Sequence, residues 1–194
     1  MKNRTLTHHW HLSRAKHVLS EGGVIAYPTE TVFGLGADPF NHDAVIKLLT
    51  IKNRPWEKGL ILIASNFEQL IPFIRPVNNS AMEKIKASWP GPFTWVFEAT
   101  DAVPEWVRGK HRSIAVRVTP HPLASLLCGY FKGPIISTSA NPSGFLATQK
   151  RILIRKWFHN KIDYFLPGDP GPYLRPSEIR NASSGKLLRA SKQT

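Results

Sequence analysis

The apolar run at residues 60–64, which reads Leu-Ile-Leu-Ile-Ala, constrains the fold of this chain more than any other segment. Successive side chains of a strand point to opposite faces, so an uninterrupted apolar run predicts a strand that is buried on both faces. A strand of this kind lies inside a sheet that helices cover on both sides. The run therefore favours a layered α/β fold.

Helix and strand patterns alternate along the rest of the chain. Helices are predicted at residues 7–21, between Asn41 and Pro55, after Ser65 in a capping box with Glu68, and at residues 79–88, 122–130 and 148–160. Further strands are predicted at residues 24–27, 94–98, 114–118, 135–138, 164–166, 178–180 and 186–189, and a loop at residues 29–36. This alternation predicts one α/β domain over residues 1–194, a twisted open mixed sheet with flanking helices. Residues 1–6 and 191–194 are expected to be flexible.

The composition fits one such domain in the cytoplasm. With 194 residues, 42% of them hydrophobic, the chain is long enough for one sizeable core and short for two. Its apolar runs are far shorter than the roughly 20 residues that span a bilayer, and its first residues are polar, so we expect a soluble protein that is not exported and meets no membrane. The single cysteine, Cys128, cannot form an internal disulfide, which fits a reducing compartment.

The chain is strongly basic. It has 26 Lys and Arg against 13 Asp and Glu, for a net charge of +13. A surface of this charge attracts polyanions, and nucleic acid, nucleotide phosphates and small anionic substrates all qualify. A basic surface that serves only solubility has the same composition, so charge alone names no partner.

Three polar loops lie beside predicted strands. Lys52, Arg54 and Lys58 precede the apolar run, Ser-Thr-Ser-Ala-Asn-Pro-Ser-Gly occupies residues 137–144 after another strand, and Pro-Thr-Glu-Thr occupies residues 28–31 after a third. Each loop alone also fits ordinary solvated or turn chemistry. Together, at strand ends, they predict a shared anion-binding cleft. The familiar glycine-rich phosphate loops do not occur, so a nucleotide would be bound in another way.

Four motifs resemble the TsaC/YrdC family in their order and spacing. They are Tyr27-Pro28-Thr29-Glu30-Thr31-Val32-Phe33-Gly34-Leu35-Gly36, Lys52-x-Arg54-Pro55, Ala115-Val116-Arg117-Val118 and Ser139-Ala140-Asn141-Pro142-Ser143-Gly144. The similarity extends over residues 21–189 and is closest to the short bacterial form. It implies a twisted open sheet with a large positive cavity, and the synthesis of L-threonylcarbamoyladenylate and pyrophosphate from L-threonine, bicarbonate and ATP. The TsaB/TsaD/TsaE machinery would then transfer the threonylcarbamoyl group to adenosine in tRNA.

The resemblance also implies the residues of the site. It places ATP contacts on Arg54, Lys58, Ser113, Asn141 and Arg189, and threonine contacts on Thr31, Arg117, Ser139 and Ser177. Lys52 and Arg54 would stabilise the charge that builds on the leaving pyrophosphate, with Mg²⁺ held by ATP and no metal ligand assigned to the protein. Arg117 suits a carboxylate, because a guanidinium can hold both of its oxygens. Ile63 stands where the two-domain relatives have a threonine-contacting histidine.

Two other functions fit parts of the sequence. One is a protein without catalytic activity that binds double-stranded RNA or tRNA, for which Lys150, Arg151, Arg155 and Lys156 form a candidate basic surface. Thr31, Arg117 and the loop at residues 139–144 argue against it, because RNA binding does not need a set of hydroxyls facing an arginine. The other is the related domain of hydrogenase-maturation carbamoyltransferases, which occurs within much longer chains.

Overall fold

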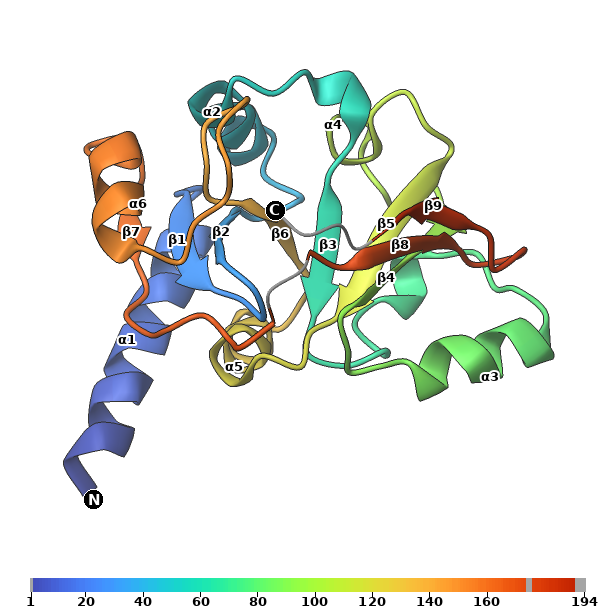
Figure 1. Ribbon diagram of the computed structural model, residues 1–194, viewed down its shortest axis with the longest axis horizontal. Helices are drawn as coiled ribbons and strands as arrows, with labels where there is room; N and C mark the ends of the chain where they lie inside the picture. The colour runs from blue at the N-terminus through green and yellow to red at the C-terminus, as the bar shows by residue number, and fades with distance from the viewer. Residues whose placement is uncertain (1, 174–175, 191–194) are drawn as a thin grey trace.

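The computed structural model describes residues 2–173 and 176–190, with side chains from residue 9 onward. Its centre is a sheet of nine strands in the order β7-β1-β2-β6-β3-β5-β4-β8-β9 (Figure 1). The strands are β1 (Ile25–Pro28), β2 (Phe33–Gly36), β3 (Ile61–Ala64), β4 (Phe93–Glu98), β5 (Ser113–Val118), β6 (Ile135–Ser139), β7 (Tyr164–Phe165), β8 (Glu178–Asn181) and β9 (Leu187–Arg189). Three pairs are parallel (β1 with β7, β3 with β5, β4 with β8) and the other five are antiparallel, so the predicted mixed sheet is confirmed.

Helices cover both faces of this sheet. They are α1 (Lys2–Ser20), α2 (His42–Lys52), α3 (Asn79–Ala87), α4 (Glu105–Arg108), α5 (Pro122–Phe131) and α6 (Arg151–Phe158), with short 3₁₀ helices η1 (Trp56–Lys58) and η2 (Ile71–Phe73). In Figure 1, α2 and α4 lie above the sheet and α5 lies below it. No helix among the described residues is both long and apolar enough to cross a membrane.

The central strand β3 divides the core into two parts. Ile63 packs with residues of α1 and α5 on one face, whereas Leu62 and Ala64 pack with residues of α2 on the other. All three side chains are almost completely buried. The apolar run therefore has the two-sided burial that the sequence predicts, and it holds β5 and β6 on either side of itself.

The loop predicted at residues 29–36 is wrong in its second half, which forms β2 and pairs antiparallel with β1. Gly34 and Gly36 resemble loop residues in the sequence, but here they make room for the buried ring of Tyr27. A Cβ atom on Gly36 would lie 2.8 Å from the Cε1 atom of Tyr27. The glycines are thus explained by close packing inside a strand, and the polar loop that remains is residues 29–32.

The capping box of Ser65 and Glu68 is also wrong. The Ser65 amide donates to the Oε1 atom of Gln69, the Gln69 amide donates to Asn66, and the segment continues into η2 instead of an α-helix. Pro72 lies within η2 and lacks the amide that a longer helix would need.

Other boundaries shift at helix ends. The first helix begins at Lys2 rather than at residue 7, and α6 begins at Arg151 rather than at residue 148. Residues 2–6, which we expected to be flexible, form the start of α1. Met1 and residues 191–194 lie outside the described residues.

The two ends of α2 direct the chain into the site. Asn41 caps the first turn by accepting a hydrogen bond from the Ala44 amide. Asn53 ends the helix in the left-handed conformation, with φ of 50°. This reversal leaves Lys52 on the buried side of the last turn and sends Arg54 out toward the ends of the strands.

Leu62→Ala should lower the free energy of unfolding by about 2–5 kcal/mol, because it opens a cavity where both faces of the strand are packed. Leu126→Ala is the matched control, since Leu126 lies on α5 with 49% of its surface exposed. Its effect should stay within about 0.5 kcal/mol. Urea denaturation followed by circular dichroism measures both, and similar losses for the two variants would contradict the central position of β3.

Candidate active site

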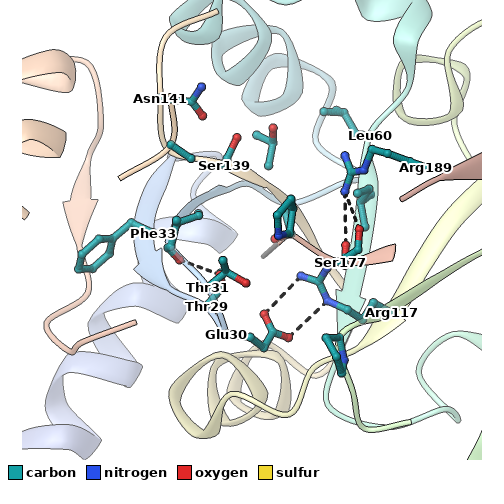
Figure 2. A pocket seen from close by; sticks show the side chains of 18 of the residues that line it. Thr29, Glu30, Thr31, Phe33, Leu60, Arg117, Ser139, Asn141, Ser177 and Arg189 are labelled. Carbon is teal, nitrogen blue, oxygen red and sulfur yellow. Dashed lines mark hydrogen bonds and ion pairs between the residues drawn. The ribbon is translucent and has the colours of Figure 1, made fainter. Parts of the chain in front are cut away.

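A cavity of about 360 Å³ opens where the polar ends of several strands and loops meet. Its size suits a small-molecule ligand. Seven of the residues that the sequence predicts for the site line it: Thr31, Arg54, Arg117, Ser139, Asn141, Ser177 and Arg189. Figure 2 shows Ser139 and Asn141 on one side and Arg117, Ser177 and Arg189 on the other. The predicted cleft between strand ends is thus present in the structure.

Three predicted residues do not line this cavity: Lys52, Lys58 and Ser113. Lys58 is exposed at the end of η1. Ser113 begins β5, where it pairs with Glu98 at the end of the strand opposite to Arg117. The structure therefore gives Lys58 and Ser113 no direct part in the cavity.

Lys52 is buried, in contrast to the exposed loop position that its sequence neighbours indicate, with 5% of its surface accessible. Its ammonium group donates to the backbone carbonyl of Ser139 and, at 2.9 Å, to that of Asn141. The backbone carbonyl of Lys52 accepts from the Ser143 amide. Burial, with a smaller contribution from Arg54, lowers the pKa of Lys52 from 10.5 to about 8. Lys52 thus fixes the loop that forms one wall of the cavity.

Asn141 lies on that wall. Its Nδ2 atom donates to the carbonyl of Phe145, which holds the turn around Pro142. Its Oδ1 atom is buried and has no hydrogen-bond partner among the described residues. Asn141 therefore lines the cavity and keeps an acceptor without an internal partner in the described structure.

Arg54 and Arg189 make the cavity lining cationic. The Nη2 atom of Arg54 donates to the carbonyl of Gly59 at 2.8 Å, and its buried Nε atom has no partner in the described part of the chain. The Nη2 atom of Arg189 donates to the carbonyl of Ser177 at 3.0 Å. Burial lowers the pKa of both guanidinium groups, and for Arg189 the neighbouring Arg117 and Arg54 lower it further. The concentration of positive charge suits an anionic ligand such as a chain of phosphates.

Arg117 lies on β5 and reaches into the cavity, where it faces the carboxylate of Glu30 (Figure 2). Its Nε atom lies 3.3 Å from Oε1 of Glu30, and its Nη1 atom donates to Thr94 at 3.3 Å. Thr94 in turn donates to the hydroxyl of Ser177 at 3.0 Å. A continuous polar chain therefore joins Arg117 to Ser177 and, through it, to Arg189.

Three polar residues around Arg117 have no role assigned from the sequence: Glu30, Thr94, and Thr119, whose hydroxyl donates to Oε1 of Glu30. Glu30 lies inside a quoted motif, so its position next to Thr31 could have drawn attention to it. Thr94 occupies a position of β4 between two apolar residues, and Thr119 directly follows β5. Nothing in their local pattern distinguishes them from surface threonines. Only the folded sheet brings these residues close to Arg117.

No group of three or more His, Cys, Asp or Glu residues that could hold a metal ion occurs in the part of the chain that the structure describes. Ile63 is fully buried, packs with residues of α1 and α5, and does not line the cavity.

Comparisons with known proteins identify the family. The Sua5/YciO/YrdC family model, described as telomere recombination, matches residues 17–191. A threonylcarbamoyl-AMP synthase of Coxiella burnetii is 52% identical over 92% of this chain and 96% of its own length. One of Pseudomonas aeruginosa is 47% identical over 90% and 94%.

Solved structures agree with this result. P. abyssi Sua5 complexed with L-threonine superposes with a TM-score of 0.87 at 31% identity, over 93% of this chain and 54% of that one. This chain therefore spans about half of the longer protein. E. coli YciO has a TM-score of 0.81 at 22% identity, over 94% and 89%, and supports the fold alone. With the family model, the relatives and the fold in agreement, this chain belongs to the Sua5/YciO/YrdC family.

Proposed function

We propose that this protein is a threonylcarbamoyl-AMP synthase, a nucleotidyltransferase that condenses L-threonine, bicarbonate and ATP to threonylcarbamoyl-AMP and pyrophosphate. The relatives that are about half identical over nearly their whole length bear that name. The observation that supports it most directly is the cavity, where one arginine with hydroxyl neighbours lies beside a second group of cationic side chains.

The part of the cavity around Arg117 suits threonine. Its guanidinium can take the carboxylate of the amino acid, while Thr31, Ser139 and Ser177 line the same cavity and can orient the rest of the molecule. The fold match to a protein solved with L-threonine supports this assignment.

The part around Arg54 and Arg189 suits the nucleotide. Both guanidinium groups can neutralise phosphate oxygens, and Asn141, which lines the same cavity, is a candidate contact for the rest of the nucleotide. Mg²⁺ would enter with the phosphates of ATP and balance part of their charge. Lys58 and Ser113 stay predictions, since neither lines the cavity.

The chemistry needs no nucleophile from the protein. The carbamate of threonine attacks the α-phosphate, so the protein contributes by holding both reactants in line and by stabilising the charge on the leaving pyrophosphate. We assign the second task to Arg54, because it lines the cavity. Lys52 acts through the loop that it holds, and it is therefore a positioning residue.

The proposal includes the setting of the reaction. The product would be passed to the TsaB/TsaD/TsaE machinery for tRNA threonylcarbamoyladenosine, in the cytoplasm, where the free thiol of Cys128 would stay reduced. Nothing in the comparisons favours the alternative of an RNA-binding protein. Two residues of the candidate basic surface have partners within the protein. The guanidinium groups of Arg151 and Arg155 lie over the ring of Phe165, and Arg151 also pairs with Asp169.

Pyrophosphate should be released only when L-threonine, bicarbonate and ATP are all present, because the carbamate must form before it can attack ATP. Mass spectrometry of the reaction mixture should show threonylcarbamoyl-AMP, and replacing threonine by other amino acids should reduce its amount. Rapid pyrophosphate release from ATP alone would refute the proposed condensation.

Arg117→Lys should weaken threonine binding by about tenfold or more, because an ammonium group keeps the charge but loses the paired contact. Affinity for ATP should change far less. Arg112→Lys is the matched control, since Arg112 lies just before the same strand and is exposed. Isothermal titration calorimetry with each ligand measures this, and equal losses for threonine and ATP would count against the assignment.

Lys52→Met should slow pyrophosphate release by about tenfold or more through disorder of the loop at residues 139–143, whereas Lys47→Met on the same helix should not. The wild type and Lys52→Met should also differ in how the free energy of unfolding depends on pH. Between about pH 8 and 10.5 the folded wild type has lost a proton that its unfolded chain still binds. Its unfolding free energy relative to Lys52→Met should therefore rise across this window. A flat difference in denaturant titrations would show that Lys52 keeps its ordinary pKa.

A further inference from the structure

Glu30 contributes the one carboxylate that lines the cavity among the described residues. Three arginines, Arg54, Arg117 and Arg189, line the same cavity. A negative charge in a site that binds anions opposes their binding, so its presence needs a specific reason. Glu30 is only 4% exposed, which makes the charge costly to bury as well.

The position of Glu30 is fixed by its surroundings. The Thr119 hydroxyl donates to Oε1 at 2.7 Å, and the Tyr173 amide donates to the Glu30 carbonyl at 3.2 Å. Gly171 packs against the same peptide so closely that a Cβ atom there would lie 2.6 Å from the Glu30 carbonyl oxygen. The carboxylate is thus held in place whether or not it pairs with Arg117.

The pair that Glu30 forms with Arg117 is loose. Nη2 of Arg117 lies 3.5 Å from Oε2, and Nε lies 3.3 Å from Oε1 without hydrogen-bond geometry. A closely paired guanidinium and carboxylate share two hydrogen bonds of about 2.7–2.9 Å. A buried ion pair that served stability alone would need this closer geometry to offset the cost of desolvation. Here both charged groups keep capacity for another partner.

An amino acid zwitterion is the partner that matches both charges. Its carboxylate and ammonium groups are attached to the same carbon atom, and Arg117 and Glu30 present the complementary charges side by side at the cavity wall (Figure 2). When the zwitterion binds, the ion pair between Arg117 and Glu30 is replaced by two pairs, one from each residue to the ligand. The net charge of the site does not change. Arg117 alone would bind any carboxylate of suitable size, including those without an amine.

We propose that Glu30 binds the ammonium group of the amino acid substrate while Arg117 takes its carboxylate. Glu30 is then a specificity-determining residue, and it selects amino acids against hydroxy acids and other carboxylates. This assignment rests on the proposed function, in which the substrate is L-threonine. The competing explanation is that Glu30 only positions Arg117, and the two differ in which part of the ligand depends on Glu30.

The test measures the binding of three ligands to the whole protein by ligand-observed NMR titration. They are L-threonine, 3-hydroxybutyrate, which lacks the amine, and threoninol, which lacks the carboxylate. Glu30→Gln should weaken threonine and threoninol about tenfold to a hundredfold, the range expected for one lost hydrogen bond to a charged group. It should not weaken the binding of 3-hydroxybutyrate or ATP, because the substitution removes a negative charge that opposes anions. Glu83→Gln, an exposed substitution on α3, controls for the change in net charge.

Other outcomes overturn the proposal. Weaker binding of threonine and 3-hydroxybutyrate with unchanged threoninol would show that Glu30 only positions Arg117. Unchanged threonine binding, or equal losses for all three ligands, would exclude ammonium recognition. If wild-type protein itself binds no threonine, the proposed function fails first, and this result is distinct from a loss confined to the variant.

A second variant keeps the test valid if Glu30→Gln does not fold, which a thermal melt would show. Thr119→Val removes the hydroxyl that donates to Oε1 and preserves the shape of the side chain. It should weaken severalfold the binding of threonine and threoninol, which are the two ligands that Glu30→Gln affects. The binding of 3-hydroxybutyrate should again not weaken. An effect on 3-hydroxybutyrate instead would overturn the proposal by the same reasoning.

Discussion

The two-sided burial of β3 is the constraint on which the rest of this structure depends. Because both faces of the strand pack against helices, β5 and β6 must lie beside it in fixed register, with Ile63 opposite Arg117 and Ile61 opposite Ser137. Arg117 and the loop that follows β6 therefore reach the cavity from a rigid support. A site that must align an amino acid with a nucleotide benefits from this rigidity, since small displacements of the reacting groups are costly.

The charged side chains near these strands take their roles from their burial as well as from their contacts. Lys52 gives its hydrogen bonds to the backbone of the loop at residues 139–143, so a residue that the motif associates with phosphate acts as an internal brace. Arg54 and Arg189 line the cavity, each with one guanidinium nitrogen bonded to a backbone carbonyl. Glu30 lies among them as a fixed counter-charge. The proposed roles divide accordingly, with two arginines for phosphate and the Arg117–Glu30 pair for the two charges of an amino acid.

Much of the fold could be predicted, because apolar periodicity and capping residues are local signals. The helix after Asn41 and the strands around Leu62 and Val116 lie where the pattern places them. The failures have physical causes. Gly34 and Gly36 resemble turn residues until the ring of Tyr27 is seen to fill the space above them. A capping box is only a preference, and at Ser65 the side chain of Gln69 satisfies the amide instead.

The sequence by itself determined the family motifs, the α/β class and the set of polar residues from which the site is built, because these depend on residue identity and spacing. Tertiary structure alone decided which of them share a cavity. Lys52 and Lys58 do not line the cavity. Glu30, Thr94 and Thr119 lie close to Arg117. The reason is that burial and partner choice depend on contacts between residues far apart in the chain. Glu30 and Thr119, joined by a hydrogen bond of 2.7 Å, are separated by 89 positions.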